Sequence, residues 1–227
     1  MDYIYQPKGA AREYCEWALN IYTGCPHACF YCYCPKILHR TPEDFFHNVA
    51  PRKNIVYGVK KQLEKQNITG KTIHLCFVGD PYPTGYDTTP TREIIKLLKK
   101  YGNHVQILTK GDGSRDFDLL DENDWYGITL DGITKRPEIG VGGLYEAKTR
   151  GIKTWISFEP VCNEKTVLAL LNFAGVSGCA DRVKIGKLNY FPSTINWKKF
   201  GQDAEALCRS LGLEYYIKES LREEMGR

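Results

Sequence analysis

Short apolar runs alternate with amphipathic stretches along most of this chain. The apolar runs are rich in β-branched and aromatic residues and are bounded by Gly, Pro, Asp or Asn, which is typical of strands. They predict strands at 17–22, 72–78, 105–109, 126–130, 154–160, 183–187 and 214–217. Between them, apolar residues spaced for one helix face predict helices at 54–66, 91–101, 116–120, 142–150, 164–174 and 200–211. Residues 218–227 are expected to form a short polar tail.

Regular alternation of strand and helix predicts βαβ units and therefore an α/β fold with parallel strands. Six or seven such units in 227 residues suit a partial (β/α)6 barrel, because a closed eightfold barrel usually needs roughly 250 residues. No repeat, low-complexity tract or long linker interrupts the pattern, so we expect a single domain over 1–227 with its core at about 14–217. Ligands of such folds bind where the parallel strands end.

Bulk composition narrows the class of protein. Apolar residues make up 42% of the chain and charged residues 26%, as in soluble globular proteins. No apolar run approaches the length of a membrane span, and the N-terminus lacks the apolar stretch of a secretory signal. We therefore expect a cytoplasmic protein without a membrane partner. The net charge of +4 permits an anionic substrate such as nucleic acid but does not require one.

The chain has nine cysteines, and four of them lie within residues 25–34. An odd number of cysteines without an export signal argues against a disulfide framework. One dense group and scattered single residues are typical of a metal site together with ordinary buried thiols. The scattered ones are Cys15, Cys76, Cys162, Cys179 and Cys208.

Within the dense group, Cys25, Cys29 and Cys32 form a C-x3-C-x2-C motif. Thiolates are the usual ligands of iron–sulfur clusters, normally four in number. Three ligands on a short loop would leave one iron of a [4Fe–4S] cluster open to a ligand that carries an amine and a carboxylate. Gly24 and Pro26 suit such a tight loop. The motif therefore predicts a cluster with one open iron.

Other chemistries remain open for these cysteines. A structural zinc site needs four ligands, normally from two paired half-motifs, and here only Cys29 and Cys32 form a C-x2-C pair. A redox dithiol made of those two residues would leave Cys25 unexplained. Cys34 is either a fourth ligand, which would close the site, or a free thiol. The residues available to complete a zinc site are His27, Cys34, His39 and His47.

With Tyr31 before its last cysteine, the motif resembles the radical S-adenosylmethionine (SAM) superfamily. The longer segment 17–33 resembles the spore photoproduct lyase-like branch, also described as DNA repair photolyase-like. Further segments resemble that branch in the same order, and the resemblance extends over residues 14–190. These segments are Gly79-Asp80-Pro81-Tyr82, Leu108-Thr109-Lys110, Arg115-Asp116 with Leu119-Leu120, and Glu159-Pro160.

The resemblance implies a radical SAM enzyme with a [4Fe–4S] cluster and SAM as cofactors. Such enzymes cleave SAM reductively to a 5′-deoxyadenosyl radical, which removes hydrogen from a substrate. The implied partners are SAM, an electron donor such as flavodoxin or ferredoxin, and an unidentified substrate, with nucleic acid or a nucleotide as one class. The alternatives are an activase or modifier of a partner polypeptide, and a non-enzymatic iron–sulfur or zinc-binding protein.

The resemblance also implies roles for single residues of the first half. Tyr31 would lie near the adenine of SAM, while Gly79, Asp80 and Pro81 would face its methionine amine. Lys110 would pair with the methionine carboxylate. The structural alternatives are packing under the cysteine loop for Tyr31, a strand-to-turn junction for 79–81, and a solvated side chain for Lys110.

In the second half, Thr129 and Glu159 would contact the ribose, the carboxylate or the substrate. Ile185 and Gly186 would flank the adenine, and Cys162 would be a hydrogen-atom donor. Each has a structural alternative as well: a buried strand threonine, core packing at 185–186, and a spectator thiol. For Glu159 the alternative is an internal ion pair with Lys184 or Lys187.

Overall fold

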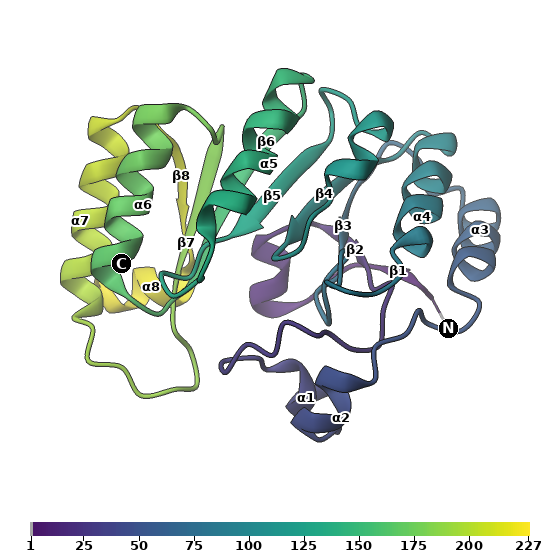
Figure 1. The fold of residues 1–227 in the computed structure, drawn as a ribbon, viewed down its shortest axis with the longest axis horizontal. Helices are drawn as coiled ribbons and strands as arrows, with labels where there is room; N and C mark the ends of the chain where they lie inside the picture. The colour runs from purple at the N-terminus through teal and green to yellow at the C-terminus, as the bar shows by residue number, and fades with distance from the viewer. Residues whose placement is uncertain (1) are drawn as a thin grey trace. The chain divides into compact units, whose positions relative to one another are not determined.

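The computed structural model describes residues 2–227, in which strands and helices alternate (Figure 1). The strands are β1 (Ile4–Tyr5), β2 (Trp17–Leu19), β3 (Thr72–Leu75), β4 (His104–Thr109), β5 (Trp125–Thr129), β6 (Lys153–Val161), β7 (Arg182–Lys187) and β8 (Glu214–Ile217). The α-helices are α1 (Cys34–Ile37), α2 (Pro42–His47), α3 (Ile55–Gln66), α4 (Thr89–Lys100), α5 (Pro137–Thr149), α6 (Glu164–Ser177), α7 (Trp197–Ser210) and α8 (Glu219–Glu224). Two 3₁₀ helices, η1 (Gly9–Glu13) and η2 (Ser114–Leu119), complete the set in this part of the chain.

The predicted fold class is confirmed. The predicted strands correspond to β2 through β8, and the predicted helices correspond to α3, α4, η2, α5, α6 and α7. Within each of two parts of the chain, paired strands follow one another in chain order, which is the topology of successive βα units. The chain divides into two compact units, the first ending at Trp125 and the second comprising Tyr126–Arg227. The single-domain assignment stays a prediction.

In the first unit, β1 pairs antiparallel with β2, and β2, β3 and β4 pair in parallel. The register places Leu19 beside Leu75 and Leu75 beside Ile107, and all three side chains are fully buried. Helices α3 and α4 lie against each other, as Figure 1 also shows. Since parallel strands end at the same edge, the segments that follow β2, β3 and β4 meet at one edge of this sheet.

In the second unit, β6, β7 and β8 pair in parallel. One face carries apolar side chains, as at the neighbours Phe158, Ile185 and Ile217. The opposite face carries polar and aromatic ones, because successive side chains of a strand alternate between faces. The register there aligns Ser157, Lys184 and Tyr216.

The C-terminal expectation was wrong, because residues 219–224 form helix α8 rather than part of a polar tail. Leu221 and Met225 are buried, and the Met225 side chain lies where a Cβ on Gly201 of α7 would stand. Two apolar residues four positions apart are enough for one short helix on a neighbour, but they are too few for a clear periodic signal. The short elements β1, α1 and α2 escaped prediction for the same reason of length.

Among residues 2–227, helices that combine the length and the apolar character needed to cross a bilayer are absent.

Candidate functional site

The three motif cysteines lie on an irregular loop between β2 and α1. Cys25, Cys29 and Cys32 are half-buried, and none of the three is in a disulfide. The Cys32 N–H donates to the carbonyl oxygen of Cys29 at 3.0 Å, and Ala28 takes a positive φ of 48°. The loop therefore turns back on itself between its second and third cysteines, as a segment wrapping a small object must.

Main-chain contacts fix the entrance of this loop. The Cys25 N–H donates to the Phe45 carbonyl of α2 at 3.2 Å, and a Cβ added to Gly24 would stand 2.7 Å from that oxygen. A Cβ added to Gly79, where φ is 143°, would stand 3.2 Å from the Gly24 carbonyl. The two glycines thus permit a close backbone approach, because a larger residue at either position would push the segments apart.

The surroundings of the thiols change their acidity in opposite directions. Burial raises the pKa of Cys25, and the neighbouring acids Asp80, Cys29 and Cys32 raise it further. A hydrogen bond from Cys34 lowers the pKa of Cys32. Since a thiolate is the metal-binding form, the buried group is stabilised as an anion when a cation lies beside it. This donor set of soft sulfur ligands fits an iron–sulfur cluster.

Cys34, the first residue of α1, is buried. Its single S–H proton has two possible acceptors, the Phe77 carbonyl at 3.7 Å and the Cys32 sulfur. Its contact with Cys32 and its burial raise its pKa, so it keeps its proton more strongly than an isolated thiol. These contacts favour a thiol that donates a hydrogen bond over a fourth ligand.

Asp80, in the segment after β3, is the most heavily hydrogen-bonded carboxylate near the cysteine loop. Its Oδ1 accepts from the Tyr82 N–H at 2.8 Å and from the Thr109 hydroxyl at 2.5 Å. Its Oδ2 accepts from the Lys110 N–H at 2.8 Å and lies 3.2 Å from His27 Nε2. Burial alone would raise the pKa of Asp80, but these contacts outweigh it and hold the pKa below the usual value.

Because a carboxylate offers about four acceptor positions, these contacts leave Asp80 little capacity for an incoming ammonium group. Its observed hydrogen bonds connect the end of β3 to the end of β4. Any contact of segment 79–81 with the methionine amine would then come from its backbone carbonyls. The assignment of Gly79, Asp80 and Pro81 to SAM stays a prediction.

A second set of contacts extends from the same segment. The Tyr82 hydroxyl donates to Asp116 at 3.1 Å, and Arg92 of α4 donates to the same carboxylate at 2.8 Å. A Cβ on Gly111 would stand 2.0 Å from the Tyr82 carbonyl. The motif pieces at 79–82, 109–111 and 115–116 therefore form one hydrogen-bonded frame in the first unit.

Lys110 and Tyr31, which the resemblance assigns separately to the carboxylate and the adenine of SAM, lie close to each other. The Lys110 Nζ lies 5.6 Å from the centroid of the Tyr31 ring, which is within the range of a cation–π contact. Both side chains are half-buried. Tyr31 follows Phe30, whose ring packs edge-on against it. The cysteine loop thus places an aromatic face and a cation side by side.

The predicted residues of the second unit fall into two groups. Glu159 lies against Gly186, because a Cβ there would stand 2.7 Å from the Glu159 carboxyl carbon. Glu159 pairs with Lys218 at 3.3 Å, whereas the sequence suggested Lys184 or Lys187 as its partner. Lys187 pairs instead with Glu224. The Lys218 pairing joins residues far apart in the chain, so no local pattern could indicate it.

The remaining predicted site residues of this unit are Thr129, Ile185 and Cys162. Thr129 is half-buried at the end of β5, and Ile185 is fully buried on the apolar face, so only its backbone is available to a ligand on the other face. The Cys162 N–H donates to the Asp131 carbonyl at 2.8 Å, and its half-buried thiol lies 3.7 Å from the Pro160 carbonyl. Their roles toward SAM or substrate stay predictions.

Sequence reasoning treated His27 only as a possible zinc ligand, and it missed Thr109 and Tyr82 as contacts of Asp80. The spacing C-x-H-x-C around His27 was the one available signal. Thr109 was quoted within a motif, but its hydroxyl bond to Asp80 connects two strand ends that only the fold brings together.

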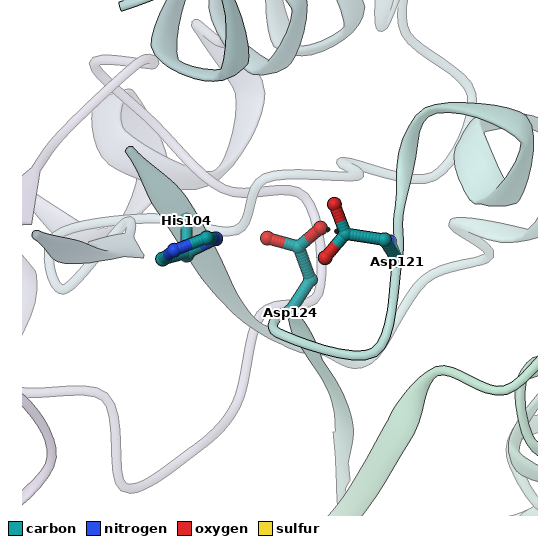
Figure 2. A group of neighbouring side chains, drawn as sticks. All are labelled: His104, Asp121 and Asp124. Atoms are coloured by element: carbon teal, nitrogen blue, oxygen red, sulfur yellow. Dashed lines mark hydrogen bonds between the residues drawn. The ribbon is translucent and has the colours of Figure 1, made fainter. Parts of the chain in front are cut away.

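A separate group of side chains has the spacing of a metal site, namely His104, Asp121 and Asp124 (Figure 2). Lys99 Nζ lies 2.6 Å from a carboxylate oxygen of each aspartate, so a cation already serves both groups. Asp124 also accepts from the Val105 N–H at 2.7 Å. His104 begins β4, whereas the cysteine loop follows the carboxyl end of β2. This group is a structural ion network at the opposite edge of the parallel strands.

Solved structures share this fold at low sequence identity. A cysteine-to-serine variant of spore photoproduct lyase has a TM-score of 0.71 with 10% identity, over 94% of this chain and 79% of that one. Spore photoproduct lyase complexed with dinucleoside spore photoproduct has 0.69 with 11%, over the same shares of 94% and 79%. SuiB of Streptococcus suis bound to S-adenosylmethionine has 0.65 with 11%, over 88% of this chain and 50% of SuiB. At these identities the likeness is one of fold.

Sequence comparisons identify the family to which the chain belongs. The uncharacterized proteins Rv2578c of Mycobacterium tuberculosis and Mb2609c of Mycobacterium bovis are each 32% identical over 124 residues, which is 51% of this chain and 36% of theirs. The chain thus spans about a third of the length of the curated relatives it matches. The family model of the Radical SAM superfamily matches residues 19–163, a segment that contains the cysteine loop and the frame around Asp80. This chain belongs to the radical SAM superfamily of enzymes.

Proposed function

We propose that this enzyme holds a [4Fe–4S] cluster on Cys25, Cys29 and Cys32 and acts with SAM on a nucleic acid or nucleotide substrate. The observation that carries the proposal is the group of three half-buried cysteines outside disulfides on one loop, which backbone contacts fix at its entrance. When bound, such a cluster supplies the electron that cleaves SAM to methionine and a 5′-deoxyadenosyl radical, which removes hydrogen from the substrate.

The residues of the first unit have distinct parts in this proposal. The loop cysteines bind three irons and leave the fourth open. Lys110 binds the methionine carboxylate as a point charge on a flexible stem. The Tyr31 ring, 5.6 Å from that ammonium group, offers its face to the adenine. Asp80 keeps Lys110 in place through the Lys110 N–H.

The proposal also assigns roles to residues of the second unit, and each role can be tested separately. Glu159 accepts a hydrogen bond from a ribose or substrate hydroxyl, and Gly186 leaves room for the Glu159 side chain. Thr129 and the backbone at Ile185 are further cofactor contacts. Cys162 gives the hydrogen atom of its S–H to the substrate radical, and the unpaired electron then lies on the Cys162 sulfur as a thiyl radical. Glu159→Gln is expected to weaken SAM binding, and Cys162→Ala is expected to change the final product while SAM cleavage continues.

The substrate class rests on two observations. One structural neighbour is a spore photoproduct lyase that contains a dinucleoside ligand, and its fold matches 94% of this chain. The net charge of +4 suits a polyanionic partner. We place the reaction in the cytoplasm with a small one-electron carrier, a flavodoxin or ferredoxin, as reductant.

Anaerobic reconstitution tests the cofactor. The protein is loaded with iron and sulfide, reduced with dithionite and mixed with SAM. We expect about four irons per chain, a reduced-cluster electron paramagnetic resonance (EPR) signal that SAM changes, and formation of 5′-deoxyadenosine with methionine. A colourless protein that binds one zinc ion, or a cluster that never cleaves SAM, would refute the proposal.

Matched cysteine variants locate the cluster. Cys29→Ala is expected to lose the cluster and SAM cleavage. Cys15→Ala is the control, because Cys15 is also half-buried but donates to the Thr72 carbonyl at 3.2 Å. Cys34→Ala is expected to keep four irons and SAM cleavage; loss of both would identify Cys34 as a capping ligand and contradict an open iron.

The substrate is sought with deuterated candidates. Dinucleotides, oligonucleotides and a peptide library are each incubated with loaded enzyme, and deuterium is measured in 5′-deoxyadenosine by mass spectrometry. Label from a nucleotide supports the proposed class. Label from a peptide alone would show a modifier of polypeptides instead.

A further inference from the structure

His27 lies in the sequence between Cys25 and Cys29, two of the proposed cluster ligands. The proposed function assigns no role to His27. Its side chain is only 12% exposed, and its Nε2 atom lies 3.2 Å from Oδ2 of Asp80, whose side chain is 8% exposed. Within residues 2–227 this buried Nε2 has no aligned hydrogen bond, so Asp80 is its available acceptor. A buried polar nitrogen of this kind needs a structural or functional reason.

Asp80 is itself immobilised by three other donors. The N–H groups of Tyr82 and Lys110 and the hydroxyl of Thr109 all reach its two oxygens at 2.5 to 2.8 Å. The carboxylate therefore cannot swing without breaking bonds to two strand ends. A side chain that contacts it becomes tied to the same rigid edge of the sheet.

We propose that His27 and Asp80 form a positioning pair that ties the middle of the cysteine loop to the ends of β3 and β4. This inference rests on the proposed cluster. Backbone contacts fix the loop at its entrance, where Cys25 N–H meets the Phe45 carbonyl. The pair adds an anchor two residues further along, between Cys25 and Cys29. Both ligands then keep their spacing before and after metal binds.

This anchor is expected to affect metal binding, because it orients residues that would bind the cluster. Groups that orient metal ligands typically change metal affinity by about 10- to 100-fold when they are removed. His27 also donates its own backbone N–H toward the Cys25 sulfur, which works against the raised pKa of that thiol. A displaced His27 would therefore disturb a hydrogen bond to a ligand sulfur, and such bonds influence cluster potential.

Two variants separate positioning from packing. His27→Leu removes the donor and keeps a buried side chain, whereas His27→Gln places an amide nitrogen near the position of Nε2. Both apoproteins are first checked for an unchanged melting temperature. Loaded proteins are then compared by iron release to a ferrous chelator, by EPR spectrum and by midpoint potential.

We expect His27→Leu to release iron about 10- to 100-fold faster than the wild type, with a changed EPR spectrum and a shifted potential. His27→Gln is expected to restore most of the wild-type retention. Wild-type retention and spectrum in His27→Leu would overturn the pair while leaving the proposed function intact. Equal loss in both variants, with lowered melting temperatures, would show packing alone and also overturn it. Failure of the wild type to hold any cluster would instead refute the proposed function, and the pair with it.

Discussion

The two units hold a buried and a half-buried carboxylate in different ways. Asp80 in the first unit is surrounded by backbone N–H groups and a hydroxyl from neighbouring strand ends. Glu159 in the second unit is paired with the ammonium group of Lys218. Dipoles fixed in the backbone cannot move away, whereas a lysine side chain can leave with its flexible stem. The first arrangement suits a rigid frame, whereas the second depends on a single side-chain cation.

Asp80→Ala tests this comparison with the largest expected effect on the free energy of unfolding. The change leaves two N–H groups and one hydroxyl without an acceptor in a buried place, and the cost of such orphaned groups adds up to about 3–5 kcal/mol of unfolding free energy. Denaturant unfolding of the apoprotein measures it. Asp118→Ala is the control, because Asp118 is 51% exposed and its ion pair with Arg92 should be worth under about 1 kcal/mol. Equal effects of the two variants would contradict the frame.

Lys218→Met tests the second arrangement. Lys218 is 2% exposed and Glu159 is 16% exposed, so the change removes a buried cation from beside a half-buried carboxylate. We expect a loss of about 2–3 kcal/mol, somewhat below that for a fully buried pair. Adding Glu159→Gln should restore part of the stability, because the negative charge that Lys218 balanced is removed as well. A double variant as unstable as the sum of the singles would show that the two side chains are not coupled.

Gly111→Ala probes how tightly the frame is packed. The new Cβ would stand 2.0 Å from the Tyr82 carbonyl, a backbone atom held by the Asp80 contacts. Overpacking against backbone costs about 1–3 kcal/mol, and iron binding should weaken together with stability. Gly142→Ala is the matched control in helix α5, where no atom lies within 4 Å of the new Cβ. It should stabilise the protein by about 0.5–1 kcal/mol, since alanine is the better helix residue.

This contrast also explains what the sequence could and could not reveal. The cysteine loop, Lys110 and the 79–82 segment were visible because each lies within a few consecutive residues. The Lys218 partner of Glu159 stayed hidden, because an ion pair between two strand ends depends on the fold. The same holds for the task of Asp80: the sequence placed it at a strand end, but only the structure shows its acceptor positions already taken. Helix α8 was missed because two buried apolar residues give no repeated pattern.

Asp181 of the second unit combines both arrangements, because it has a backbone donor and a lysine partner. Its replacement is expected to have the smallest effect on stability. It accepts from the Thr154 N–H at 2.7 Å and pairs with Lys148 at 2.6 Å. Burial would raise its pKa, but Lys148 and the Thr154 N–H outweigh this and hold the pKa below the usual 3.8. A depressed folded-state pKa contributes stability that is fully present above the unfolded value and is lost as pH falls through the folded value.

We therefore expect Asp181→Asn to be less stable than the wild type at pH 7, with a gap that narrows as the pH falls below about 4. Denaturant unfolding of both proteins at several pH values measures the gap. Lys148→Met separates the two donors: if the lysine dominates, most of the pH dependence disappears with it, and if the backbone N–H dominates, most of it remains. A gap that is constant with pH would contradict the depressed pKa and leave Asp181 with a purely steric role.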